Sequence, residues 1–306
     1  MTAPPVAPTV VVVGAAARDL DESDPRGWRL GGGVTYGGLT VARLGLPTGV
    51  LIGVDAEAAH AVEIDLLREA GAEVRLVPLR RGPIFINLET PTGRAQTGFS
   101  ASDPVGPEHL PVEWRAARGW LMGAVADELP ASWAAAVPPD ATMATGWQGL
   151  LRDIVPGELV HRRRPAASAI IARSDIVGVG SDDLTDDILV EDLCALMKPG
   201  ATLAFTQGER GGLAIEVGHP RPRSMTRWPG IPPARIVDHT GAGDVFLAGL
   251  LAARVEPRLI GGRTGSRLDL RLAAAVGSLV LEDVGLAGVP GRDAVRRRLR
   301  EPAAIP

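Results

Sequence analysis

A short segment of glycines and acidic residues, Asp238 to Asp244, has the residue types needed to handle a negatively charged group. Gly241, Ala242 and Gly243 leave their backbone N–H groups unobstructed, and the apolar run after them predicts a helix that begins there. Free N–H groups and the positive end of a helix converge at such a point, so the segment predicts an anion site. Asp244 would take a proton from an attacking hydroxyl while the amides hold a transferring phosphoryl group. An ordinary glycine turn is the alternative interpretation of these residues.

The residues 238–246, which read Asp-x-Thr-Gly-Ala-Gly-Asp-x-Phe, resemble the C-terminal motif of the PfkB, or ribokinase-like, carbohydrate kinases. Seven positions match in register, and the resemblance extends over nearly the whole chain. It implies an ATP-dependent, Mg²⁺-assisted transfer of a phosphoryl group to a hydroxyl of a sugar or polyol. In this interpretation Asp244 is the general base, and the amides of Gly241, Ala242 and Gly243 form the anion hole.

The acceptor residues are implied by several matches to the family. One is a second motif, which is only partly retained in residues 31–45. Tyr36, the only tyrosine, stands where the family has an asparagine that binds the sugar, so the standard hexose and ribose substrates are not expected. Asp19 matches the family aspartate that accepts hydrogen bonds from substrate hydroxyls. Local matches in 87–96 and 148–152 are similar to a branch of bacterial kinases related to plant inositol kinases. The expected acceptor-binding residues are Asp19, Gly32, Gly33, Tyr36, Asn87 and Gln148.

The nucleotide and cation residues are also implied by the resemblance. Thr206, Gly208 and Gly211 resemble a family turn that meets the ATP phosphates at the carboxyl end of a strand, although the turn alone is typical of a hairpin. Asp183 replaces the family glutamate that places Mg²⁺ through water, but Gly180 replaces the accompanying asparagine, so metal placement is expected to be altered. Asp238 matches a ligand of a monovalent cation such as K⁺. No P-loop signature is present.

Short apolar runs alternate with helical patterns along the chain, which predicts an α/β fold with a mostly parallel sheet and helices on both faces. Strands are expected near 9–13, 49–54, 119–122, 141–144, 175–179 and 202–206, and helices near 39–44, 56–70, 243–253, 267–281 and 292–300. A hairpin at 84–99, with its turn at 91–93, interrupts this order. We expect one ribokinase-like domain, 1–306, with a β lid from about 17–30 and 80–101. An antiparallel edge pair of the main sheet is the alternative.

Composition limits the partners. The formal charge of −4 does not indicate a nucleic-acid surface, and no stretch approaches a membrane span. The single cysteine, Cys194, is consistent with a reducing cytoplasm and is expected to be buried. The arginine clusters at 162–164 and 296–298 are expected on solvated helix faces. In the family, lids often pair, so a homodimer through the lid is expected.

Two other functions are consistent with these residues. A nucleoside kinase of the same fold would need an aromatic wall for the base, which Tyr36 and Trp147 could supply. A catalytically weak ligand-binding or regulatory protein would explain the two lost asparagines, at positions 36 and 180, but not the intact Asp244. A screen of acceptors distinguishes these functions from a sugar or polyol kinase.

Overall fold

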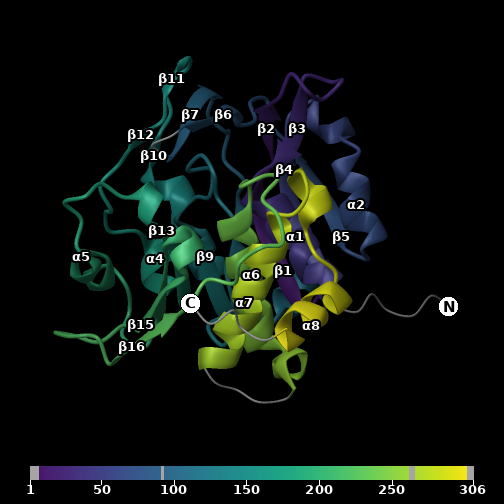
Figure 1. Cartoon of the computed structure of the whole chain (residues 1–306). Coiled ribbons are helices and arrows are strands. Elements are labelled where there is room, and N and C mark those ends of the chain that lie inside the picture. The colour runs from purple at the N-terminus through teal and green to yellow at the C-terminus, as the bar shows by residue number, and fades with distance from the viewer. Residues whose placement is uncertain (1–6, 91–92, 262–265, 302–306) are drawn as a thin grey trace.

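A computed structural model describes residues 7–90, 93–261 and 266–301, and every structural statement below refers to them. A nine-stranded sheet crosses the molecule in the order β16-β15-β14-β13-β9-β8-β1-β4-β5 (Figure 1). The strands from β14 to β5 are parallel, β15 is antiparallel to β14, and β16 is antiparallel to β15. This sheet consists of β1 (Val10–Ala15), β4 (Thr48–Val54), β5 (Glu73–Pro78), β8 (Gly119–Met122), β9 (Thr142–Gly146), β13 (Ile176–Gly180), β14 (Thr202–Thr206), β15 (Gly212–Glu216) and β16 (Ser224–Trp228).

Both faces of the central sheet are covered, as the unbroken valine run of β1 requires. Val10 and Val12 pack into the core formed with α1, α6 and α7, whereas Val11 and Val13 pack on the opposite face among tryptophans. The sequence therefore predicted the fold class correctly. The helices are α1 (Gly33–Arg43), α2 (Glu63–Glu69), α3 (Trp133–Ala136), α4 (Ala169–Arg173), α5 (Val190–Ala195), α6 (Ala242–Val255), α7 (Ser266–Val280) and α8 (Arg292–Arg300).

The expected helix at 56–70 is shorter than predicted. The Asp55 side chain accepts a hydrogen bond from the backbone N–H of Ala58 and starts a single 3-10 turn, Ala58–His60. Ala61 is then extended, with φ −66° and ψ 130°, so the regular helix α2 begins only at Glu63. The extended backbone at Ala61 therefore divides the predicted helix into a capped 3-10 turn and a shorter α-helix.

A second, five-stranded sheet lies beside the central one, in the order β11-β7-β6-β2-β3 (Figure 1). The hairpin is therefore part of a separate sheet and not an edge pair of the central sheet. Residues 91 and 92 of its expected turn lie outside the described residues. The strands of this sheet are β2 (Ala17–Leu20), β3 (Trp28–Gly31), β6 (Ile84–Thr90), β7 (Gly93–Ser100) and β11 (Glu158–Leu159).

The predictions for one arginine cluster and for the cysteine have different outcomes. The cluster at 162–164 does not lie on a helix, because Arg162 belongs to β12 (His161–Arg162), which pairs with β10 (Arg152–Asp153). Cys194 is buried as expected, and burial raises the pKa of its thiol. Among the described residues, no helix is long and apolar enough to cross a bilayer.

Candidate active site

Two helix N-termini meet at Asp244. Asp244 is the third residue of α6, after the N-cap Gly241 and the residues Ala242 and Gly243. Helix α1 begins nearby at Gly33, and a Cβ added at Gly33 would lie only 2.9 Å from Oδ1 of Asp244. The free N–H groups and positive dipole ends of both helices are therefore directed at one region. This arrangement favours negative charge at Asp244 and on a group bound beside it.

Gly241 is held in a conformation that only glycine adopts readily. Its φ of 80° is in the left-handed region, where a side chain costs free energy. A Cβ at this position would also lie 2.4 Å from the ring of Tyr36, which is 2% exposed. Tyr36 thus supports the turn from α1, and the predicted anion-hole loop is fixed by packing as well as by its own backbone.

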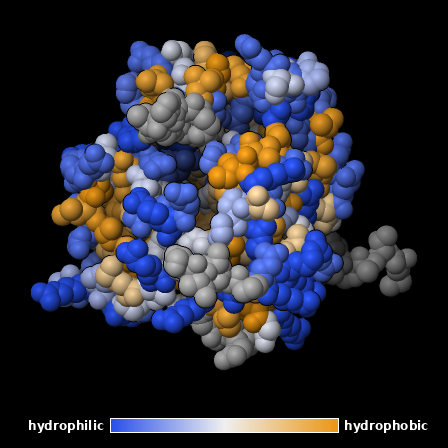
Figure 2. Space-filling model, in the orientation of Figure 1, coloured by the Kyte–Doolittle hydropathy of each residue, from blue (hydrophilic) through white to orange (hydrophobic). Residues whose placement is uncertain are grey.

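A pocket that is partly open to solvent lies beside Asp244. The surface is hollowed below the second sheet, and both hydrophilic and hydrophobic residues border the visible part of the hollow (Figure 2). Among the predicted residues, the lining includes Asp19, Gly32, Tyr36, Gln148, Gly241 and Asp244. The other lining residues are Ala17, Phe85, Gln96, Val125, Arg152 and Thr240.

Asn87, predicted as a substrate residue, does not line the cavity but bonds to two residues that do. Its Nδ2 donates to Oδ1 of Asp19 at 2.8 Å, and its Oδ1 accepts from Nε2 of Gln96 at 2.6 Å. The carboxylate accepts only, so it fixes the orientation of both amides. Gln96 is left with its carbonyl oxygen Oε1 as an acceptor. Gln96 therefore favours a ligand that donates hydrogen bonds, such as one rich in hydroxyl groups.

Gln148, in the 3-10 turn that follows β9, shows the same polarity. Its Nε2 donates to Oδ1 of Asp183 at 2.8 Å, which leaves Oε1 as an acceptor. Arg152 supplies the cation of the cavity lining, with its guanidinium 5.8 Å from the ring centroid of Phe85. An arginine only donates hydrogen bonds, so it complements these acceptors when a hydroxyl group lies between them.

The predicted nucleotide turn follows β14. Gly208 has φ 57° and open space around it, whereas a Cβ at Gly211 would lie 2.1 Å from the carbonyl oxygen of Trp228. The turn is thus packed on one side and open on the other. Asp183 lies at the end of the neighbouring strand β13 and accepts from the backbone N–H of Gly180 at 3.2 Å.

The carboxylates predicted to hold cations are already hydrogen-bonded. Asp238 accepts from the backbone N–H groups of Thr240 at 2.8 Å and Gly285 at 2.9 Å, so it joins two loops. Across the residues described, no group of three His, Cys, Asp or Glu side chains could enclose a metal ion. The donor set at Asp183 thus fits an ion held through water and donor phosphates better than a direct protein cage. Both cation sites stay predictions.

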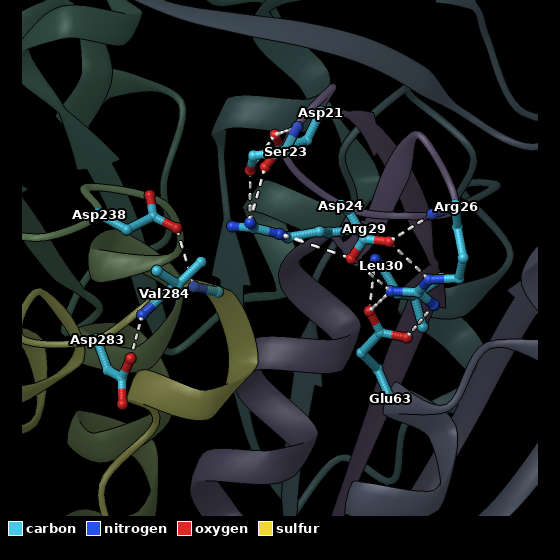
Figure 3. Close-up of polar contacts among 11 residues, drawn as sticks. Asp21, Ser23, Asp24, Arg26, Arg29, Leu30, Glu63, Asp238, Asp283 and Val284 are labelled. Carbon is cyan, nitrogen blue, oxygen red and sulfur yellow. Dashed lines mark hydrogen bonds and ion pairs between the residues drawn. The ribbon is translucent and has the colours of Figure 1, made fainter.

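The β2–β3 connection borders this region and is crossed by ion pairs (Figure 3). Arg29 donates to Ser23 at 2.9 Å and pairs with Asp21 at 3.1 Å. Hydrogen bonds from the side chain and backbone of Arg26 lower the pKa of Asp24 to about 2. Arg26 also contacts Glu63 of α2 at 2.6 Å. The turn is therefore stabilised by contacts among its own residues and by the ion pair between Arg26 and Glu63 of α2.

Sequence reasoning found the residues that belong to local motifs and missed those that only the fold brings together. Gln96 and Arg152 lay inside segments singled out in the sequence, but the hydrogen bond from Gln96 to Asn87 and the contact of Arg152 with the Phe85 ring depend on how the strands pair in the fold. Val125 carried no signal, because an isolated valine after a strand is typical of any core. Trp147, considered as a pocket wall, is 1% exposed and belongs to the core beside Leu151.

The comparisons with known proteins agree with this arrangement. Residues 182–290 match the family described as pfkB family carbohydrate kinase. A pyrophosphate-dependent kinase in the ribokinase family, complexed with a pyrophosphate analog and myo-inositol, is similar with a TM-score of 0.73 and 18% identity. That similarity covers 94% of this chain and 99% of that chain. No curated protein matches at the level of sequence.

Two further solved structures show the same fold. Ribokinase of Arabidopsis thaliana, complexed with ribose and ATP, has a TM-score of 0.67 and 20% identity, covering 97% of this chain and 100% of that chain. Nucleoside kinase of Methanocaldococcus jannaschii has a TM-score of 0.67 and 15% identity, covering 96% and 99%. At these identities the likeness is one of fold, and the acceptor must be argued from the residues of the cavity.

Proposed function

We propose that this chain, a carbohydrate kinase of the PfkB family, transfers the terminal phosphoryl group of ATP to a hydroxyl of a neutral polyol of the inositol type or a related sugar. The observation that carries the proposal is the position of Asp244. Its carboxylate lies at the convergence of two helix N-termini and borders a cavity. In this cavity the side chains of Gln96 and Gln148 offer their carbonyl oxygens as hydrogen-bond acceptors. A base and an anion site next to a hydroxyl-binding cavity are the components that phosphoryl transfer requires.

The roles of the residues follow from this geometry. Asp19, Gln96 and Gln148 would accept hydrogen bonds from acceptor hydroxyls and orient one of them toward Asp244. Asp244 would remove the proton of that hydroxyl as it attacks. The N–H groups of 241–243 would stabilise the charge on the transferred group, a contribution of about 3–4 kcal/mol per well-placed donor in other enzymes. Bound Mg²⁺ would neutralise phosphate charge, with Asp183 and Thr206 as the residues placed to hold it through water.

ATP is proposed as the donor over pyrophosphate, although one similar structure is a pyrophosphate-dependent kinase. Ile236 and Val237, which directly precede the anion-hole loop, are 55% and 45% exposed. Exposed apolar side chains at this point offer a surface for a nucleotide base, for which pyrophosphate has no counterpart. The open side of Gly208 leaves room for the phosphates.

A polyol acceptor is favoured over a nucleoside by the aromatic side chains. Tyr36 and Trp147 were the candidates for a wall against a base, but one is packed under Gly241 and the other lies in the core. Phe85 does line the cavity, but the guanidinium of Arg152 lies over its ring. The polar lining is therefore better suited to hydroxyl groups than to a stacked base.

The proposal is tested by a grid of donors and acceptors. Each of ATP and pyrophosphate is offered with inositols, hexoses, pentoses and nucleosides, and the phosphorylated product is detected by mass spectrometry. We expect an inositol or another polyol with ATP to give the highest kcat/KM. Transfer only to nucleosides would contradict the acceptor, and transfer only from pyrophosphate would contradict the donor. Saturable binding of a polyol without any transfer would support the ligand-binding alternative.

A further inference from the structure

The loop that follows β8, residues 123–128, lies against the backbone of three site-bearing segments. A Cβ at Gly14 would lie 2.6 Å from the carbonyl oxygen of Gly123, and one at Gly33 would lie 3.0 Å from the same oxygen. A Cβ at Gly149 would lie 2.4 Å from the carbonyl group of Ala124. Gly33 neighbours Asp244, and Gly149 follows Gln148. A displacement of this loop would therefore shift the surroundings of Asp244 and Gln148.

Glu128 holds this loop from inside. Its side chain is buried, with the residue 1% exposed. Oε1 accepts from the backbone N–H of Ala15 at 2.9 Å, and Oε2 accepts from Ala126 at 2.8 Å. The N–H of Val125 is shared between the two oxygens, at 3.2 and 3.1 Å. One carboxyl group therefore joins the end of β1 to the loop, and Val125 is part of the cavity lining.

The backbone next to Glu128 is strained. Asp127 has φ 60°, and it is the single non-glycine residue with positive φ in the described part of the chain. Such a conformation costs free energy and persists when its surroundings enforce it. Oδ2 of Asp127 accepts from Arg163 at 2.9 Å. Since Arg163 follows β12, the partner of the strand that carries Arg152, the loop is also linked to this two-stranded β10–β12 sheet.

We propose that Glu128 is a positioning residue for the acceptor: its carboxyl group, bonded to the N–H groups of Ala15, Val125 and Ala126, fixes the Val125 wall and the register of the loop against Gly33 and Gly149. The inference rests on the proposed kinase function and extends it to a residue that does not line the cavity. Burial raises the pKa of the Glu128 carboxyl above its ordinary value, while the N–H donors oppose this shift. The fixed geometry matters because small displacements of reacting groups cost rate steeply.

The test compares Glu128→Gln with Asp269→Asn. The amide of Gln retains one acceptor oxygen but sets an NH₂ group against a backbone N–H, so the loop loses part of its attachment. Asp269 of α7 is also buried and accepts from Arg254 at 3.0 Å and from the N–H of Leu270, and it lies outside the cavity lining. Both variants lose hydrogen bonds to a buried carboxylate, but only Glu128→Gln disturbs the acceptor site.

We expect Glu128→Gln to raise the acceptor KM at least tenfold and to change the donor KM less than twofold, whereas Asp269→Asn leaves both KM values unchanged. Hydrogen exchange should show faster exchange in 123–128 for Glu128→Gln alone. Should Glu128→Gln fail to fold, Glu128→Asp, one methylene shorter, replaces it with the same expectation. An unchanged acceptor KM in a variant whose loop exchanges faster would overturn the inference, and so would unchanged exchange. Absence of transfer by the unmodified protein would instead count against the kinase function, and the exchange comparison would still show whether Glu128 holds the loop 123–128.

Discussion

At the scale of single residues, the contact between Tyr36 and Gly241 determines how the anion-hole loop is held. The aromatic ring occupies the space into which any side chain at position 241 would project. In the sequence, Tyr36 departs from the resemblance to the family, and the departure suggested a lost sugar contact or an aromatic wall for a base. The structure adds a packing role, because the ring of a buried tyrosine supports the turn at which α6 begins.

A matched pair of substitutions tests this packing. Gly241→Ala places a methyl group at φ 80° and 2.4 Å from the Tyr36 ring, so we expect it to lower the free energy of unfolding by about 2–4 kcal/mol. Gly243→Ala adds a methyl group with nothing within 4 Å, in a helix that favours alanine, and should change stability by at most about 1 kcal/mol. Urea unfolding measures both. Equal stability of the two variants would show that Tyr36 does not hold the loop.

Local motifs made some residues predictable and left others hidden. Asp244 and Gly241 stand three residues apart, so their joint chemistry could be predicted from the sequence. Asp19 and Asn87 are separated by 68 positions, and their hydrogen bond depends on β2 pairing with β6. Glu128 was missed because its partners are backbone N–H groups, which carry no sequence signal.

At the scale of elements, the β2–β3 connection is attached to α2 through Glu63. Oε1 of Glu63 accepts from Arg26 at 2.6 Å and from the backbone N–H of Leu30 at 3.3 Å (Figure 3). Burial alone would raise the pKa of Glu63, but the hydrogen bonds from Arg26 and Leu30 outweigh burial and hold the pKa below its ordinary value. A carboxylate with a lowered pKa stabilises the folded state above its unfolded pKa, and this contribution is lost as pH falls.

The attachment predicts a pH-dependent difference in stability. Glu63→Gln should lower the free energy of unfolding at pH 7 by about 1–3 kcal/mol, because it removes a charged acceptor of hydrogen bonds. The difference from the unmodified protein should shrink as pH falls below about 4, where the glutamate becomes protonated. Asp65→Asn on the same helix is the control, since the Asp65 side chain is 64% exposed and should have little effect. The free energies of unfolding are measured with denaturant at pH 7 and pH 3. If the difference between Glu63→Gln and the unmodified protein were the same at pH 3 as at pH 7, the stabilising role of the Glu63 carboxylate would be refuted.

At the scale of the whole molecule, the parallel sheet brings the functional segments to one edge. The segments that carry Asp19, Val125, Gln148 and Asp183 follow the carboxyl ends of β1, β8, β9 and β13. The alternation of apolar runs and helical patterns was enough to predict six strands of this nine-stranded sheet, because each run is long enough to cross it once, but β5, β15 and β16 were not expected. The order of the strands and the separate second sheet depend on pairing between distant segments, which periodicity does not specify.

The account as a whole is tested most directly by the turnover of Asp244→Asn with ATP and the best acceptor of the screen. Asn keeps the shape of the side chain but cannot take the proton, so we predict a fall in kcat of about 10²–10⁴ with unchanged thermal stability. Asp293→Asn, in the first turn of α8 and 83% exposed at its side chain, should keep full turnover. A folded Asp244→Asn protein with near-normal kcat would contradict the proposed role of Asp244 and with it the active site described above.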